Sequence, residues 1–182
     1  ALPLLLVVSL GSCASSRFAV VKTDTELAQQ EWLLQTTELA GLPPLPQRRA
    51  AIYDYYKLGF LHDKYPGKYV SGTLVPHPIY GVYVIHDYIT RFRETGNTSN
   101  LHAAMTVADA AISRMILDNE MLLFFYEPDW HLTSTPHRYV SGLTQSYYLD
   151  QFSSLAQFTG EHRFTEAAEL VLQSLDTTVE KG

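Results

Sequence analysis

Tyrosine and histidine side chains gather at the start of two similar segments of the chain. Both residue types can donate or accept a proton when burial and neighbouring groups tune their pKa values, and their rings can pack against a ligand. The candidate binding residues at these positions, and in the loop between the segments, are His77, Tyr80, Tyr83, Trp130, Tyr139 and Gln145. We therefore predict a polar and aromatic site where the two segments begin.

Each of these residue types also has an ordinary structural use. Tyr80 and Tyr83 lie in an apolar stretch and could be core residues that bond their hydroxyls internally. His77 precedes Pro78 and could cap a loop, and the amide of Gln145 could bond neighbouring backbone. The residue types alone leave both uses open, so the arrangement in space has to decide between them.

A loop between the two segments carries a further group of ionisable residues, Glu127, Asp129 and His131. They could form a metal or acid–base cluster, or they could be solvated loop side chains. The sequence contains no HExxH helix, no phosphate-binding glycine loop, no dinucleotide glycine pattern and no GxSxG turn. We therefore expect no metal and no cofactor, and the sequence assigns no catalytic residue.

The two segments belong to an internal repeat. Residues 77–115 and 141–175 align so that Thr95-Gly96 matches Thr159-Gly160 and Tyr83 matches Tyr147. Each block reads as a helix, a tight glycine turn and a second helix. Repeated helical hairpins predict an array of stacked or ring-closed hairpins.

The two helices of each block differ in polarity. The first helix of the first block is apolar on nearly every side, which predicts complete burial, and the second is apolar on one face only. An inner buried helix followed by an outer amphipathic one is the pattern of an α/α toroid. We therefore predict an all-α fold, the first half of an (α/α)6-type barrel, with one short extended insert at residues 121–126.

Shorter patterns describe the segment before the repeat. Thr23 and Glu26 have capping-box spacing and begin a helix over residues 24–39, which the prolines at residues 43–46 end. Residues 50–60 are ambiguous between helix and strand. Residues 61–78 carry several prolines and glycines and predict an ordered loop, with short extended pieces such as Tyr69-Val70.

The repeat resembles the C-terminal catalytic domain of D-glucuronyl C5-epimerases. The resemblance covers roughly residues 70–178, about half of such a domain. It depends on His77-Pro78 before the first inner helix, on residues 140–145 (VSGLTQ) before the second, and on the two Thr-Gly turns. Family members usually continue with Gly-Gln where this chain has Ser146-Tyr147.

The resemblance implies inversion at C5 of hexuronate residues, from D-glucuronate to L-iduronate type, in an exported polysaccharide. This reaction needs donors that neutralise the sugar carboxylate and an acid and a base on opposite ring faces. The family's main catalytic residues lie in later helices, so we expect this chain to be inactive by itself. The alternatives are a toroid glycoside hydrolase or uronate lyase, or a non-catalytic glycan-binding envelope lipoprotein.

The first residues predict export. Residues 2–10 (LPLLLVVSL) are too short to span a bilayer but fit the apolar core of a secretory signal. They are followed by Gly11-Ser12-Cys13, which resembles a bacterial lipoprotein signal in which Cys13 is the lipid attachment site. An incidental free cysteine in a buried N-terminal strand is the alternative. The lipoprotein interpretation predicts a protein of the bacterial cell envelope, facing the periplasm or the exterior and held to the membrane only through this lipid.

Composition agrees with one globular unit and limits its partners. The chain has 182 residues, of which 46% are hydrophobic, and a net charge of −6 with only 13 Lys and Arg. An acidic chain without a basic patch is unsuited to nucleic acid. The partner that the resemblance implies is a uronic-acid-containing polysaccharide. The predicted organisation is a signal peptide at 1–13, a tether at 14–23, the helix and Pro-rich segment at 24–68, and the truncated toroid domain at 69–182.

Overall fold

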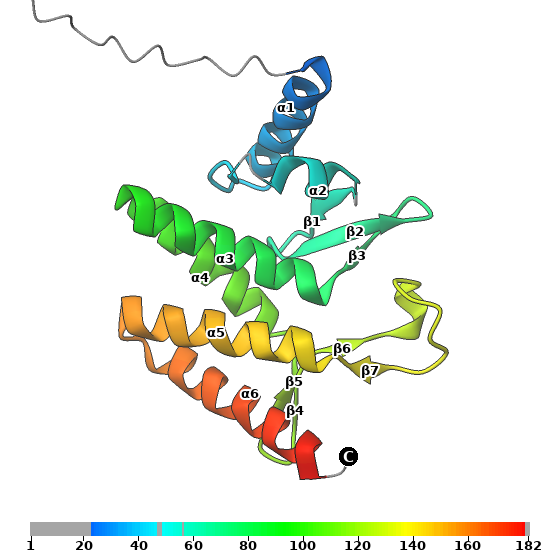
Figure 1. Ribbon diagram of the computed structural model, residues 1–182, viewed down its shortest axis with the longest axis vertical. Helices are drawn as coiled ribbons and strands as arrows, with labels where there is room; N and C mark the ends of the chain where they lie inside the picture. Colours follow the sequence, from blue (N-terminus) through cyan, green and yellow to red (C-terminus); the bar gives the residue numbers. More distant parts are fainter. Residues whose placement is uncertain (1–22, 47–48, 56, 181–182) are drawn as a thin grey trace, which may run out of the picture.

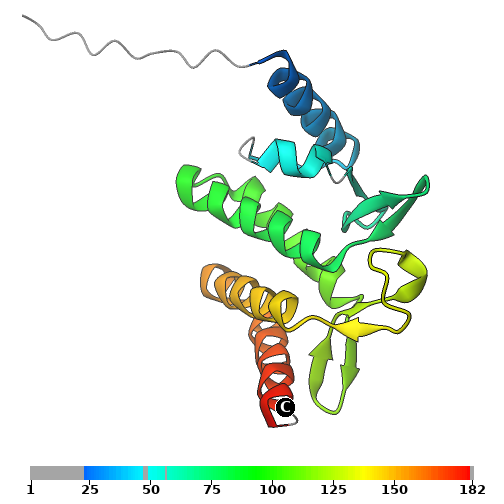
Figure 2. The ribbon, with the colours of Figure 1, turned by 45° about the vertical axis from the view of Figure 1, so that its right-hand side comes forward.

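The computed structural model describes residues 23–46, 49–55 and 57–180, with side chains as far as residue 176. The predicted signal peptide, Cys13 and nearly all of the tether lie outside these residues. Figure 1 shows a helical N-terminal part above two helical hairpins, with short strands gathered at the end where the hairpins begin. The second view gives the same arrangement (Figure 2).

The all-α prediction is wrong. About 61% of the chain is helical and about 15% is strand, and the described part holds six α-helices and three small antiparallel sheets. The fold is therefore mixed α and β, and the toroid assignment fails with it. The sequence repeat indicated the helical hairpins but gave no account of the segments that precede and separate them.

Two of the β-hairpins are closed by two-residue turns with left-handed backbone. Ser71 and Gly72 have φ of 50° and 82°, and Asn119 and Glu120 have φ of 48° and 65°. Two consecutive positive φ values match the twist of antiparallel strands, which is why such turns close hairpins. The first turn joins β2 (Pro66–Val70) to β3 (Thr73–Pro76), so the stretch predicted as an ordered loop is a hairpin that contains Tyr69 and Val70.

Three further strand pairings complete the sheets. Strand β1 (Leu58–Phe60) pairs with β2, which resolves the ambiguity of its segment after the short helix α2 (Ala50–Tyr55). Strands β4 (Ile116–Asp118) and β5 (Met121–Leu123) form the second hairpin. Strand β6 (Phe125–Tyr126) pairs with β7 (Tyr139–Val140) across a loop that contains the 3-10 turn η2 (Pro128–Trp130).

The helices follow the predicted local signals closely. Helix α1 (Asp24–Leu39) begins with the capping box of Thr23 and Glu26. The two repeat blocks form the hairpins α3 (Pro78–Thr95) with α4 (Thr98–Ile112), and α5 (Gly142–Thr159) with α6 (His162–Glu180). Gly96 and Gly160 end α3 and α5 with φ of 67° and 68°, the left-handed conformation that glycine adopts without strain. The repeat prediction is therefore confirmed at the level of the hairpins.

A hydrogen-bonded cluster of Tyr65, Tyr148 and Pro78 links the loop before β2 to α3 and α5. The hydroxyls of Tyr65 and Tyr148 are hydrogen-bonded at 2.8 Å, and that of Tyr148 donates to the backbone carbonyl of Pro78 at 2.9 Å. The Tyr65 hydroxyl also lies 3.2 and 3.3 Å from the carbonyls of His77 and Pro78. Both side chains are completely buried. Gly81 leaves the space that the two hydroxyls occupy, since a Cβ there would lie 2.5 Å from the Tyr65 oxygen and closer still to that of Tyr148.

This geometry predicts that Gly81→Ala destabilises the protein by about 2–4 kcal/mol, because the added methyl group displaces both buried hydroxyls from their hydrogen bonds. The matched control is Gly142→Ala, in the first turn of α5, where a Cβ meets no atom within 4 Å. That change should leave the free energy of unfolding unchanged or raise it by up to about 1 kcal/mol. Urea unfolding of the two variants measures the difference in the free energy of unfolding. Equal effects would contradict the structural role of the Tyr65–Tyr148–Pro78 cluster.

Candidate functional site

A polar groove lies between helices α3 and α5, which pack side by side (Figure 1). The groove is also lined by Arg49, which immediately precedes α2. Its volume is about 340 Å3, within the range of small-molecule sites. The lining residues are Arg49, Val82, Tyr83, His86, Tyr147, Asp150 and Gln151.

The groove unites residues that the internal repeat relates. Tyr83 comes from α3 and Tyr147 from the equivalent position of α5, so two matched tyrosines face one space from different helices. Tyr83 is half-buried and Tyr147 is exposed over 40% of its surface. Of the described residues that line the groove, Asp150 is the one carboxylate. The groove therefore offers hydroxyl groups on two sides and little negative charge.

A buried ion pair with Asp87 holds Arg49, the cation of this groove, in place. Asp87 lies in the middle of α3 with none of its surface exposed, and a buried carboxylate is stable only when it is paired. Arg49 Nε lies 2.9 Å from its Oδ1, and the Tyr53 hydroxyl donates to its Oδ2 at 2.8 Å. Burial, and then Asp87, hold the pKa of Tyr53 well above its usual value, so it stays a donor.

The same arginine also covers a tyrosine of the groove. The guanidinium carbon of Arg49 lies 4.9 Å from the ring centre of Tyr83, within cation–π range. A guanidinium has five N–H donors in a plane, so the ion pair through Nε leaves donors for a second anion. Asp87 thus holds Arg49 in a fixed position from which it can bind a ligand carboxylate.

A second cluster of aromatic side chains lies where α3 begins. The rings of His77 and Tyr80 stack at 4.0 Å, and those of Tyr126 and Tyr139 stack at 5.0 Å. His77 also meets Tyr126 edge to face at 6.0 Å, which joins the two stacks. The Tyr126 hydroxyl is bonded to that of Thr144 at 3.0 Å. Four rings from α3, β6 and β7 therefore form one continuous packed group.

His77 is the polar member of this cluster that the packing isolates. Its Nδ1 is buried and has no hydrogen-bond partner in the described part of the chain. Burial, with a smaller contribution from the charge of Lys68, lowers the pKa of His77 from 6.5 to about 4. The ring is therefore neutral at pH 7 and packs as an aromatic group.

The structure divides the predicted binding residues into separate groups. His77, Tyr80 and Tyr139 meet in the aromatic cluster, whereas Tyr83 faces the groove. Trp130 is half-buried in η2 and packs against the hydrophobic core. The expected common site at the helix starts is thus split into an aromatic cluster and a groove further along α3.

The side chain of Gln145 has a structural role. Its amide nitrogen donates to the carbonyl of Leu122 at 2.8 Å and to the hydroxyl of Ser174 at 3.0 Å, and its oxygen accepts from the amide of Phe124 at 3.2 Å. The side chain is almost completely buried. These bonds satisfy the backbone around β5, which is the structural alternative that the sequence left open.

Of the residues that line the groove, the sequence predicted Tyr83 as a site residue and missed Arg49, Tyr147 and Asp150. It also missed Asp87, the buried partner of Arg49. One signal was available, because a charged residue inside a helix that is otherwise apolar all round requires a buried partner. Asp87 occupies such a position in α3. Its partner was not readable, since Arg49 lies in a segment whose path depends on the tertiary structure.

The described part of the chain contains no group of three or more His, Cys, Asp or Glu side chains placed to hold a metal ion. The loop residues Glu127, Asp129 and His131 accordingly do not form such a cluster. Among the described helices, none is long and apolar enough to cross a membrane.

Comparison with known proteins identifies no relative. No model of a protein family matches the chain, and neither a curated protein nor a solved structure shows significant similarity to it.

The isolation of His77 predicts a loss of stability in mild acid. Its folded pKa of about 4 lies below the usual 6.5, so the unfolded chain binds more protons between these pH values. The contribution of a neutral His77 is complete above about pH 6.5 and disappears as the pH falls to about 4, for a total of at most about 3 kcal/mol. Urea unfolding at a series of pH values measures this loss.

The variant His77→Gln should show a smaller loss of stability over the same pH range, because it has no imidazole to protonate. The control is His162→Gln, since the side chain of His162 is 89% exposed and lies outside the aromatic cluster. The same pH dependence in the wild type and in His77→Gln would show that burial of His77 does not control acid stability.

Proposed function

We propose that the chain binds hexuronate residues of an exported polysaccharide in the α3–α5 groove and inverts them at C5. The observation that carries this proposal is the convergence of a fixed arginine with two tyrosines from opposite helices in one groove. The resemblance to D-glucuronyl C5-epimerases supports the same substrate class. The predicted lipoprotein signal supports a location in the cell envelope, where such polysaccharides are exposed.

Arg49 supplies the electrostatic part of the reaction. The proton at C5 is α to the C6 carboxylate, and its removal places further negative charge on that group. A guanidinium paired with the carboxylate stabilises this charge as it develops. Because Asp87 already fixes Arg49, little reorganisation is needed when the sugar binds.

The two tyrosines supply the proton transfers. Inversion requires one group to remove the C5 proton from one ring face and another to return a proton to the opposite face. Tyr83 on α3 and Tyr147 on α5 approach the groove from different helices, which suits this division. The substrate gains and loses one proton, so the reaction needs no oxidant and no cofactor.

A glycoside hydrolase is less well supported by the groove. Hydrolysis uses two carboxylates about 5–10 Å apart on either side of the bond that is cleaved. Asp150 alone supplies a carboxylate among the described lining residues, because Asp87 is occupied by Arg49 and Tyr53.

The proposal predicts exchange at C5 when the chain is incubated with heparosan in heavy water. Mass spectrometry should detect deuterium at C5 together with L-iduronate-type residues. Tyr83→Phe and Tyr147→Phe should each lower the rate of epimer formation by about 100-fold or more, because each removes one proton-transfer group. Arg49→Lys should lower it by about tenfold, because an ammonium lacks the planar donors of the guanidinium.

Two control variants keep these losses interpretable. Tyr55→Phe removes the hydroxyl of a tyrosine that is 77% exposed on α2, and Arg91→Gln removes a cation from α3 outside the groove. Both should keep the wild-type rate. The sequence predicts no activity from this chain alone. Because the proposal assigns the required groups to residues of this chain, the chain itself is the test material.

Other products would overturn the proposal in distinct ways. Unsaturated uronates would identify a lyase, and new reducing ends would identify a hydrolase. Saturable binding of heparosan without exchange would leave a non-catalytic glycan-binding protein. Epimer formation that is unchanged in both tyrosine variants would remove the assigned proton-transfer roles.

A further inference from the structure

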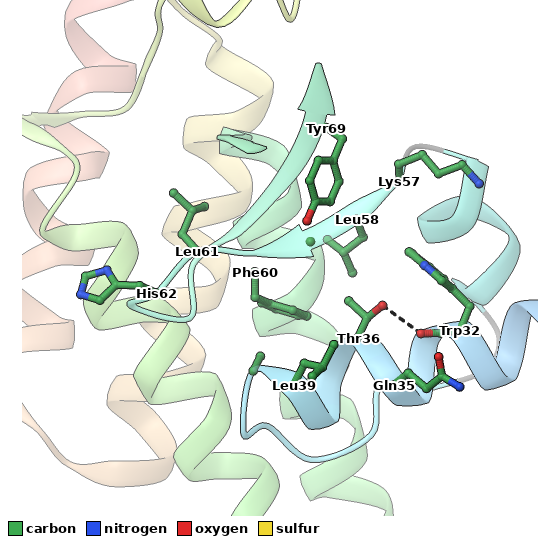
Figure 3. Close-up of a pocket in the computed structure, with 12 residues that line it drawn as sticks. Trp32, Gln35, Thr36, Leu39, Lys57, Leu58, Phe60, Leu61, His62 and Tyr69 are labelled. Atoms are coloured by element: carbon green, nitrogen blue, oxygen red, sulfur yellow. Dashed lines mark hydrogen bonds between the residues drawn. The ribbon is translucent and has the colours of Figure 1, made fainter. Parts of the chain in front are cut away.

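A second cavity, of about 470 Å3, lies between the C-terminal half of α1 and the first sheet. Its lining residues differ from those of the groove. Figure 3 shows Trp32, Thr36 and Leu39 along α1, facing Leu58 and Phe60 of β1, with Tyr69 descending from β2. Three aromatic side chains from three separate elements therefore surround one space.

The aromatic walls of this cavity are held in place by packing. Trp32 and Phe60 are half-buried and pack against the hydrophobic core. The Tyr69 ring lies against β1 because Gly59 has no side chain there, and a Cβ at Gly59 would lie 2.9 Å from the ring. The rings are thus presented to solvent in fixed positions, although Tyr69 is 50% exposed. Binding a ligand to these rings therefore costs little side-chain conformational entropy.

Polar groups border the same rings. The hydroxyl of Tyr69, the amide of Gln35 and the ammonium of Lys57 all belong to residues that line the cavity. Thr36 donates its hydroxyl proton to the carbonyl of Trp32 at 2.8 Å, so its oxygen can still accept a hydrogen bond. Lys57 is paired with Asp54 at 2.9 Å and is largely exposed. The cavity therefore combines flat apolar faces with hydrogen-bonding edges.

We propose that this cavity is a second glycan-binding site, which holds a pyranose residue by stacking on Trp32 and Tyr69 and by hydrogen bonds to its hydroxyls. A sugar ring has apolar C–H faces and hydroxyl edges, which match the two kinds of lining group. A purely apolar ligand would cover the hydroxyl of Tyr69 and the amide of Gln35 without partners, at about 1–3 kcal/mol for each. The site requires no sugar carboxylate and is independent of the proton transfer assigned to the groove.

Trp32 itself reports on occupancy. The chain has two tryptophans, Trp32 and Trp130, so the variant Trp130→Phe makes the fluorescence specific to this cavity. The probes are cellohexaose, maltohexaose and a heparosan hexasaccharide, a set that varies both linkage and charge. We expect a saturable change in Trp32 fluorescence with a dissociation constant of about 0.1–1 mM, typical of a small stacking site. Neutral and uronate-containing probes should both bind.

Variants at the cavity separate stacking from hydrogen bonding. In the Trp130→Phe background, Tyr69→Leu should weaken binding by about tenfold through the lost ring, and Tyr69→Phe by about threefold through the lost hydroxyl. Tyr55→Leu, which changes an exposed tyrosine outside the cavity, should leave the affinity unchanged. Circular dichroism of each variant verifies that the fold is retained, and Tyr69→Phe remains informative if Tyr69→Leu fails to fold.

The result also distinguishes this site from the groove. Arg49→Lys should lower the rate of epimerisation by about tenfold without altering the Trp32 signal, whereas Tyr69→Leu should alter the Trp32 signal without changing the rate of epimerisation. Absence of a saturable signal with all three oligosaccharides would overturn the second site. Preferential binding of n-hexanol would also overturn it, because it would identify an apolar docking surface.

Discussion

The fold depends on a chain of hydrogen bonds through two buried tyrosine hydroxyls. Tyr65, in the loop before β2, bonds the hydroxyl of Tyr148 on α5, which donates to the carbonyl of Pro78 at the start of α3. Burial raises the pKa of both tyrosines, which keeps them protonated and able to donate. The missing side chain of Gly81 leaves room for both hydroxyls and so allows α3 and α5 to pack closely at this point.

The candidate site follows from this close packing. Because α3 and α5 lie side by side, Tyr83 and Tyr147 face a common groove. The buried charge of Asp87 then fixes Arg49 at the edge of that groove, where its remaining donors are available. The same requirement that buried polar groups be paired explains Gln145, whose amide is used by the backbone around β5. A polar side chain can bind a ligand here only if it keeps hydrogen-bonding groups that the fold does not use, as Arg49 does and Gln145 does not.

Local patterns predicted much of the secondary structure and little of the site. The capping box at Thr23, the apolar periodicity and the Thr-Gly turns correctly gave α1 and both helical hairpins. The extended insert at 121–126 is confirmed as β5 and β6, and the extended piece at Tyr69-Val70 as part of β2. Strands β3 and β4 were missed, because the turns at Ser71 and Asn119 are short signals within segments of mixed composition. Tyr83 was predicted as a site residue, whereas Arg49 was not, since its role depends on a contact with distant Asp87.

The sequence by itself determined the helices, their caps and the repeat that relates Tyr83 to Tyr147, because these depend on residues a few positions apart. Only the tertiary structure decided which polar groups meet. The Tyr53–Asp87 bond spans 34 residues and the Tyr65–Tyr148 pair spans 83. Such pairs depend on the path of the chain between them, which no local pattern encodes. The same path made the fold mixed α and β, since the strands form between helices that the repeat alone describes.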